Sequence, residues 1–170
     1  MSEGLRCWVE ISREQLAANY HAIKRTVGSS VEVMPVVKAD AYRHGAVEVS
    51  RVLTEAGAHW LAVSSVDEGV ALRLAGIDAR VLVMGGVLPW ERSMLVEYEL
   101  TPAVHDLAEI PRLGPIAYHL KIDSGMGRMG TRSGAAEILE ATRNAHGARL
   151  EGLMTHFASS ADFTSPQTEL

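Results

Sequence analysis

The sequence predicts an α/β fold built on a parallel sheet. Short β-branched and apolar runs alternate with stretches of helical periodicity, a pattern typical of parallel strands covered by helices. That periodicity fits either a doubly wound sheet or a barrel. Polar side chains favour the barrel, because they lie at or just after the carboxyl ends of predicted strands, and all such ends meet on one face of a barrel. These residues are Lys38, Ser64, Asp123 and His156.

The length limits how much of a barrel is present. A (β/α)8 TIM-type barrel takes roughly 250 residues, or at least roughly 200, whereas this chain has 170. We therefore expect an incomplete (β/α)8 barrel of about six β/α units. Residues near the missing strands, such as Val81 and Leu120, are expected to lie uncovered and to leave edges open to self-association.

The amino-terminal half contains three of the predicted strands. Ser12 is a helix N-cap with Gln15 at the capping-box position, and the helix that follows ends at Gly28. The β-branched run 31–37 predicts a buried strand, in which Pro35 is tolerated only near the beginning. The alternation continues with a helix at 46–56, a strand at 60–64, a helix at 67–75 and a strand at 81–84.

The carboxyl-terminal half repeats the alternation. Pro89 fits the first turn of a helix, where its missing N–H costs nothing. Glycines at 125, 127 and 130 predict a loop. The remaining predicted elements are a strand at 100–104, a short helical piece from 106, a strand at 116–122, a helix at 135–146 and a strand at 150–155.

Composition excludes several classes of protein. With 47% hydrophobic and 22% charged residues the chain is globular rather than disordered. A net charge of −5 and the lack of a basic stripe disfavour nucleic-acid binding. The longest uncharged apolar run, 81–90, is about half of the ~18 residues that a membrane span needs. The amino terminus does not resemble a signal peptide and Cys7 has no partner, so we expect a soluble cytoplasmic protein without membrane association.

Lys38 is the first candidate for chemistry. It follows the apolar run 31–37, so we expect its stem to be buried and its amine to face the carboxyl ends of the strands. Burial lowers the pKa of a lysine amine, which is the condition for a nucleophile that attacks carbonyl groups. A lysine at a strand end can equally reach solvent or pair with Asp40, and position alone leaves both interpretations open.

Two further candidates follow predicted strands. In the glycine-rich loop, Arg128 offers a planar fork of donors to a carboxylate or a phenolate, and its alternative role is an ordinary surface charge. The glycine spacing matches neither a Walker loop nor a dinucleotide fingerprint. His156 lies at a strand end beside Phe157, where a structural histidine is the alternative to a catalytic one. No metal-ligand spacing occurs, so no metal site is predicted.

Three segments taken together, in order and spacing, resemble the alanine racemase family. They are VVKADAYRHG at 36–45, KIDSGMGRMG at 121–130 and GLMTHFAS at 152–159. The start, at 8–11 and in the helix with Asn19 and Tyr20, is also similar to the family's amino-terminal pattern. Arg43 departs from the pattern, because the family usually has glycine there, and this affects the local turn more than the chemistry.

The resemblance implies a role for each site residue. Lys38 would bind pyridoxal 5'-phosphate (PLP) covalently and, once substrate displaces it, would act as the base that exchanges the α proton. Tyr42 would contact the cofactor phosphate. Arg128 would donate to the phenolic oxygen of PLP and help to hold the substrate carboxylate, and His156 would lie against the cofactor ring. Lys121 would support the site, at a position that is often carbamylated in the family.

The resemblance also implies the activity of the complete enzyme. It would be a fold-type III PLP-dependent isomerase that interconverts L-alanine and D-alanine and supplies D-alanine for peptidoglycan. Residues 1–170 would form its PLP-binding barrel domain in truncated form, without the carboxyl-terminal β domain. A second base from the partner subunit would make the enzyme a homodimer. On this hypothesis the chain is an amino-terminal fragment and is inactive, or nearly so, by itself.

Three other interpretations stay open at this point. A serine-preferring racemase of the same family would share every motif. A non-catalytic PLP-binding barrel protein of cofactor homeostasis would lack the β domain, but the loop at 123–130 and Tyr42 favour a racemase. A plain (β/α) domain would bind no cofactor at all.

Overall fold

The computed structural model describes residues 6–162 and 164 and confirms the α/β class. Its elements in chain order are α1 (Arg13–Val27), α2 (Lys38–Arg43), α3 (Ala46–Glu55), β1 (Trp60–Val63), α4 (Val66–Leu74), β2 (Arg80–Val83), η1 (Pro89–Glu91), α5 (Arg92–Glu97), β3 (Leu100–Val104), η2 (Leu107–Arg112), β4 (Ala117–Lys121), α6 (Ala135–Arg143) and β5 (Arg149–Met154), where η denotes a 3-10 helix. Within the described residues, no helix is long and apolar enough to cross a membrane.

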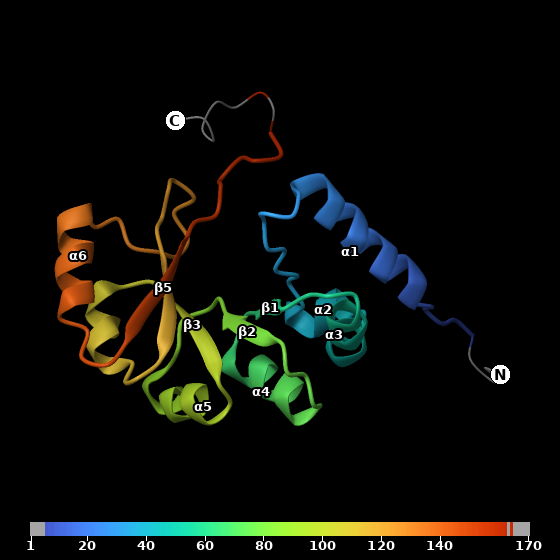
Figure 1. Cartoon of the computed structure of the whole chain (residues 1–170), viewed down its shortest axis with the longest axis horizontal. Coiled ribbons are helices and arrows are strands. Elements are labelled where there is room, and N and C mark those ends of the chain that lie inside the picture. The colour runs from blue at the N-terminus through green and yellow to red at the C-terminus, as the bar shows by residue number, and fades with distance from the viewer. Residues whose placement is uncertain (1–5, 163, 165–170) are drawn as a thin grey trace.

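The strands form one parallel sheet in the order β1-β2-β3-β4-β5, which corresponds to part of a (β/α)8 barrel. Each connection between neighbouring strands contains helical structure, as right-handed parallel units require. Figure 1 shows α1 at one end of this sheet and α6 at the other. The carboxyl ends of the strands therefore lie along one edge, where the sequence places its polar residues.

The predicted strand at 31–37 is wrong as an element of the sheet. Only one isolated parallel bridge forms there, between Val36 and Ala62. It consists of two hydrogen bonds: the Val37 N–H donates to the Ala62 carbonyl at 2.8 Å, and the Ala62 N–H donates to the Pro35 carbonyl at 2.8 Å. Pro35 has no N–H to donate, and the chain turns sharply after Val37, so the pairing does not extend. The described residues thus form five strands instead of the predicted six.

The helix predicted at 135–146 is shorter in the structure, where α6 ends at Arg143. The Ala145 N–H donates to the Thr142 carbonyl, three residues back, and this tightened turn ends the helix.

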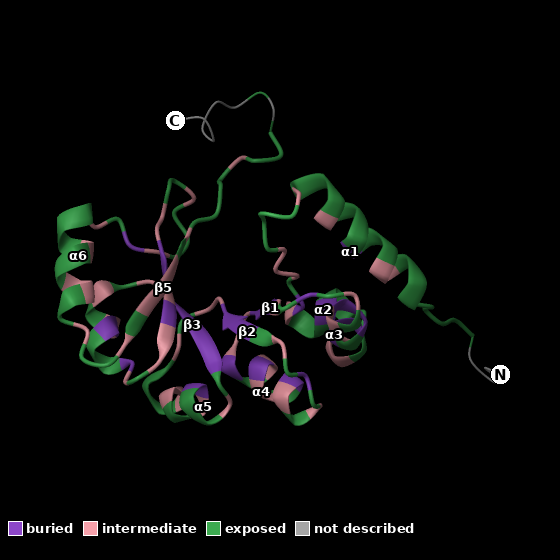
Figure 2. Ribbon diagram, in the orientation of Figure 1, coloured by how far each residue is buried: buried purple, intermediate pink, exposed green. Residues whose placement is uncertain are grey.

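Val81 and Leu120 are covered, contrary to the sequence prediction. Both are 0% exposed, because their side chains pack in the clusters between the sheet and its helices, and an absent neighbouring strand does not uncover that face. The opposite face of the sheet carries a smaller cluster of Ala62, Leu82 and Ala103, with Met84 packed against it. In Figure 2 buried residues are prominent in β2 and β3, whereas α1 and α6 are largely exposed.

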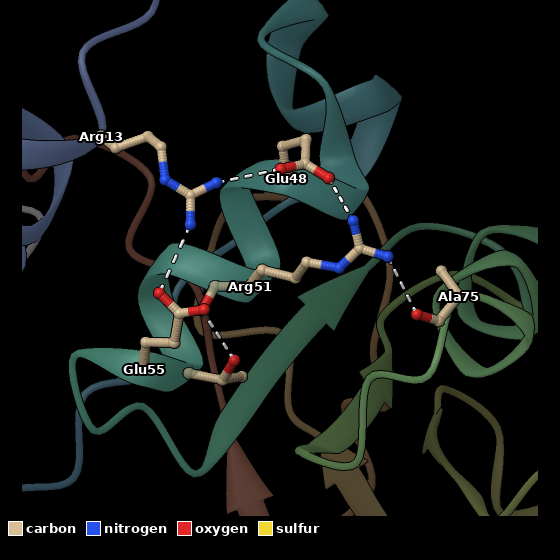
Figure 3. Close-up of polar contacts among 6 residues, drawn as sticks. Arg13, Glu48, Arg51, Glu55 and Ala75 are labelled. Carbon is tan, nitrogen blue, oxygen red and sulfur yellow. Dashed lines mark hydrogen bonds and ion pairs between the residues drawn. The ribbon is translucent and has the colours of Figure 1, made fainter.

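Exposed ion pairs connect α1 to α3 (Figure 3). The Arg13 guanidinium of α1 contacts the carboxylates of Glu48 at 3.0 Å and Glu55 at 3.4 Å. Arg51 also contacts Glu48, and it donates to the carbonyl of Ala75 at the end of α4 at 3.3 Å. Because the side chains of Arg13, Glu48 and Glu55 are more than half exposed, each pair contributes at most about 1 kcal/mol.

Candidate functional site

A cavity of about 280 Å³ lies at the carboxyl ends of β1, β2, β4 and β5. It brings together four of the five site residues predicted from sequence, namely Lys38, Lys121, Arg128 and His156. The other lining residues are Ser64, Met84, Gly85, Met129, Met154 and Thr155. Among these lining residues there are three cationic or amine side chains and no carboxylate, so the cavity suits a ligand that is anionic and reacts with an amine.

The backbone after Lys38 forms a left-handed turn. Four consecutive residues have φ between 50° and 56°, from Ala39 to Tyr42, and Arg43 follows at 71°. Left-handed backbone costs an L-residue roughly 1–2 kcal/mol, so surrounding contacts must compensate. Asp40 contributes one of these contacts, because its carboxylate accepts from the Ala46 N–H at 2.7 Å instead of serving Lys38 as an ion-pair partner.

Arg43 stands at a position where the backbone favours glycine. Its positive φ explains why glycine would suit this turn better than arginine. The side chain is exposed, and the turn keeps its hydrogen bonds, since the Gly45 N–H donates to the Asp40 carbonyl at 3.0 Å.

Tyr42 lies outside the Lys38 cavity. It is 56% exposed and lines a neighbouring apolar cavity of about 420 Å³, which α1 borders through Leu16 and Tyr20. The sequence placed Tyr42 at the same site as Lys38; the structure places it one turn further along the same segment.

Lys121 is the most enclosed cation of the site, at 7% exposure. Burial lowers the pKa of its amine, and the Arg128 guanidinium lowers it further, while Asp123 opposes the shift. His105 directly follows β3. The residue before it, Val104, pairs with Leu120 of β4, which precedes Lys121. The His105 Nε2 lies 3.1 Å from the Met84 carbonyl. Burial, and then the Lys121 charge, lower the pKa of the His105 imidazole, while the bonds to the Met84 and Gly85 carbonyls oppose this shift.

The loop after β4 is built around Asp123. Its carboxylate accepts from the Gly127 N–H at 2.9 Å and pairs with the Arg132 guanidinium at 2.7 Å. The Gly127 bond, and then Arg132, lower the pKa of Asp123 to about 2. Gly130 has a φ of 120°, and a Cβ there would lie 2.8 Å from the Asp123 nitrogen, so only glycine fits. This loop places the exposed Arg128 at the cavity.

Sequence reasoning missed two residues that organise the site. Arg132 holds the loop, and nothing in the spacing from Asp123 indicates this, because only the folded loop brings the two together. Glu68 accepts from the Ala39 N–H at 2.7 Å, directly after Lys38. A signal for Glu68 does exist, since Ser65 and Glu68 have capping-box spacing. No group of three potential metal ligands occurs among the described residues.

Comparison with known proteins identifies the family. A sequence profile described as the alanine racemase N-terminal domain matches residues 11–170. The chain belongs to this family. An alanine racemase of Halothermothrix orenii is 40% identical over 161 residues, which are 89% of this chain and 42% of that protein.

Solved structures of alanine racemases match the fold as well. That of Clostridium difficile 630 superposes with a TM-score of 0.89 at 31% identity, over 98% of this chain and 48% of that one. An alanine racemase from Bacillus anthracis with bound L-Ala-P superposes with a TM-score of 0.87 at 34% identity, over 95% of this chain and 44% of that one. The chain thus spans about half the length of the alanine racemases it matches.

Proposed function

We propose that this chain is the PLP-binding part of an alanine racemase, and that the whole protein interconverts L-alanine and D-alanine. The observation that carries the proposal is the cavity in which Lys38, Lys121, Arg128 and His156 meet without a carboxylate among the lining residues. Membership of the alanine racemase family supports the same assignment.

PLP fits this cavity by its functional groups. Its aldehyde requires a primary amine, and Lys38 is the half-buried amine at the cavity wall. Its phenolate and phosphate require cationic partners or hydrogen-bond donors, which Arg128 and Lys121 supply from β4 and its loop. When bound, PLP supplies an electron sink for the charge left on the α carbon when a proton leaves.

Each residue has a distinct task in the proposal. Lys38 attaches PLP and then carries the α proton on one face of the substrate. Arg128 donates to the phenolic oxygen and the substrate carboxylate, with Lys121 as the supporting cation behind it. His156 lies against the ring. The resemblance assigns the phosphate contact to Tyr42, which is exposed four residues after Lys38 and lies outside the cavity in the chain without cofactor.

The proposed racemase is a homodimer that supplies D-alanine for peptidoglycan in the cytoplasm. Exchange of a proton on both faces of a substrate needs a second base, which we assign to the rest of the racemase and its partner subunit. We therefore expect the 170-residue chain alone to racemise alanine far more slowly than a full-length racemase. A rate comparable to that of a full-length enzyme would contradict this division of tasks.

A PLP titration tests the cofactor assignment. Covalent attachment of PLP to an amine changes the absorption spectrum of the cofactor, and we expect this change in the wild-type chain but not in Lys38→Ala. Lys24→Ala is the matched control, because Lys24 lies on α1 and donates to the Val31 carbonyl at 2.7 Å, away from the cavity. Folded wild-type chain that leaves the PLP spectrum unchanged would refute the assignment.

A further inference from the structure

The Glu68 carboxylate accepts hydrogen bonds from three backbone N–H groups in two segments that adjoin the Lys38 cavity. Its Oε1 accepts from the Ala39 N–H at 2.7 Å, while its Oε2 accepts from the N–H groups of Ser64 at 2.6 Å and Ser65 at 3.2 Å. The Glu68 N–H donates to the Ser65 hydroxyl at 3.3 Å, which completes a capping box. One side chain of α4 therefore holds both the end of β1 and the first peptide after Lys38.

A helix cap alone does not explain this arrangement. A capping box needs only one carboxylate oxygen, directed at the N-cap N–H. Glu137 of α6 shows that simpler case: its carboxylate accepts from the Gly134 N–H at 2.9 Å. In Glu68 the second oxygen takes a donor 29 residues away in sequence, in the unfavourable left-handed turn that carries Lys38.

The bond to Ala39 holds the backbone directly after Lys38. Left-handed backbone persists only where neighbouring contacts determine it. The peptide between Lys38 and Ala39 is held on one side by Glu68, and the preceding residue is held to β1 by the bond between the Val37 N–H and the Ala62 carbonyl. Both attachments together hold the backbone on either side of Lys38.

We propose that Glu68 is a positioning residue for Lys38: it anchors the left-handed turn to β1 and α4 so that the amine enters the cavity. The functional meaning of this anchor rests on the proposed attachment of PLP to Lys38. The anchor itself is a property of the chain without cofactor. Loss of a hydrogen bond to a charged group corresponds to about a tenfold change in an equilibrium constant, or more.

The test compares three variants of the 170-residue chain. Glu68→Ala removes the anchor and the cap. Ser65→Ala removes the hydroxyl of the same capping box but keeps the hydrogen bond from the Ala39 N–H to the Glu68 carboxylate. Glu137→Ala removes the corresponding carboxylate from α6. Circular dichroism establishes that each chain is folded. Amide hydrogen exchange at Ala39, measured by NMR without PLP, and the Kd for PLP are then determined for all.

We expect Glu68→Ala to speed exchange of the Ala39 amide and to raise the Kd for PLP, each about tenfold, with both control variants close to wild type. If Glu68→Ala does not fold, Glu68→Asp takes its place, because the shorter carboxylate stays near Ser65 and withdraws from Ala39. Glu68 variants that match Ser65→Ala in exchange and in Kd would overturn the proposal. Should wild-type chain bind no PLP, the proposed function fails, and the exchange of Ala39 alone decides whether Glu68 is the anchor.

Discussion

Helices α1 and α4 are held in place by different means. The longer helix, α1, has 15 residues, and Tyr20 is its one buried residue; exposed ion pairs from Arg13 connect it to α3. The nine-residue α4 buries Val66, Gly69 and Leu72 against the sheet and has a complete capping box. Helix length thus says little about how firmly a helix is attached, because packing of an apolar face dominates helix stability in proteins.

The same contrast separates the two cavities. The apolar cavity beside Tyr42 is bordered by α1, whereas the Lys38 cavity is bordered by strand ends and is tied to α4 through Glu68. A reactive amine must be held in a defined geometry, and the more tightly packed region carries it. Four experiments, each based on one or two substitutions, test this contrast.

The largest difference is expected between leucines of the two helices. Leu72 of α4 is 1% exposed, so Leu72→Ala is expected to lower the free energy of unfolding by about 2–5 kcal/mol. Leu16 of α1 is only partly buried, and Leu16→Ala is expected to cost less than half as much. Urea denaturation of both variants measures this, and equal losses would show that α1 is packed as firmly as α4.

A substitution in α1 is expected to stabilise the chain. The Tyr20 hydroxyl is buried without a hydrogen-bond partner among the described residues, and burial raises the pKa of this phenol. Removal of an unpaired buried hydroxyl in Tyr20→Phe is expected to raise the free energy of unfolding by about 1 kcal/mol or more. The same denaturation experiment applies; a loss of stability would mean that the hydroxyl has a partner in solution.

A smaller gain in stability is expected from a substitution in the left-handed turn after Lys38. Arg43→Gly places the residue that tolerates positive φ at a φ of 71°, so we expect a rise of roughly 1 kcal/mol in the free energy of unfolding. Ala75→Gly serves as the contrasting control, since φ there is −83° and a glycine at such a position is expected to lower stability. A gain at both positions, or at neither, would count against backbone strain at Arg43.

The smallest effect is expected from the ion pairs of α1. Arg13→Ala removes contacts to Glu48 and Glu55 between side chains that are more than half exposed, so the loss should stay within about 1 kcal/mol and shrink as salt is added. A larger loss that salt does not change would indicate that Arg13, rather than apolar packing, holds α1 in place.

Sequence periodicity predicted the regular elements well. The helix after Ser12 and the strands at 60–64 and 100–104 appear at or within one residue of their predicted bounds, because apolar pattern and caps are local signals. The strand predicted at 31–37 was wrong, because a β-branched run does not show how many of its residues pair with a neighbouring strand. The left-handed turn could not be foreseen from alanine, aspartate and tyrosine, because a bond from Glu68, 29 residues away, helps to hold it.

Some site residues could be predicted from sequence and others could not, because only local signals are visible in the sequence. Their position at the carboxyl ends of predicted strands was enough to single out Lys38 and His156, and both line the cavity. Arg128 and Lys121 needed the family motif for their roles, whereas Tyr42 lines the neighbouring cavity. Arg132 gave no local signal, because its contact with Asp123 exists only once the loop has folded.

The most direct measurement maps where PLP attaches. The chain contains three lysines, Lys24, Lys38 and Lys121, so borohydride reduction of the PLP-treated protein followed by peptide mass spectrometry can assign every adduct. We predict that the adduct forms on Lys38 at PLP concentrations that leave Lys24 and Lys121 unmodified. Modification of Lys24 to the same extent as Lys38, or of Lys121 in preference to Lys38, would contradict the assignment of this cavity as the PLP site.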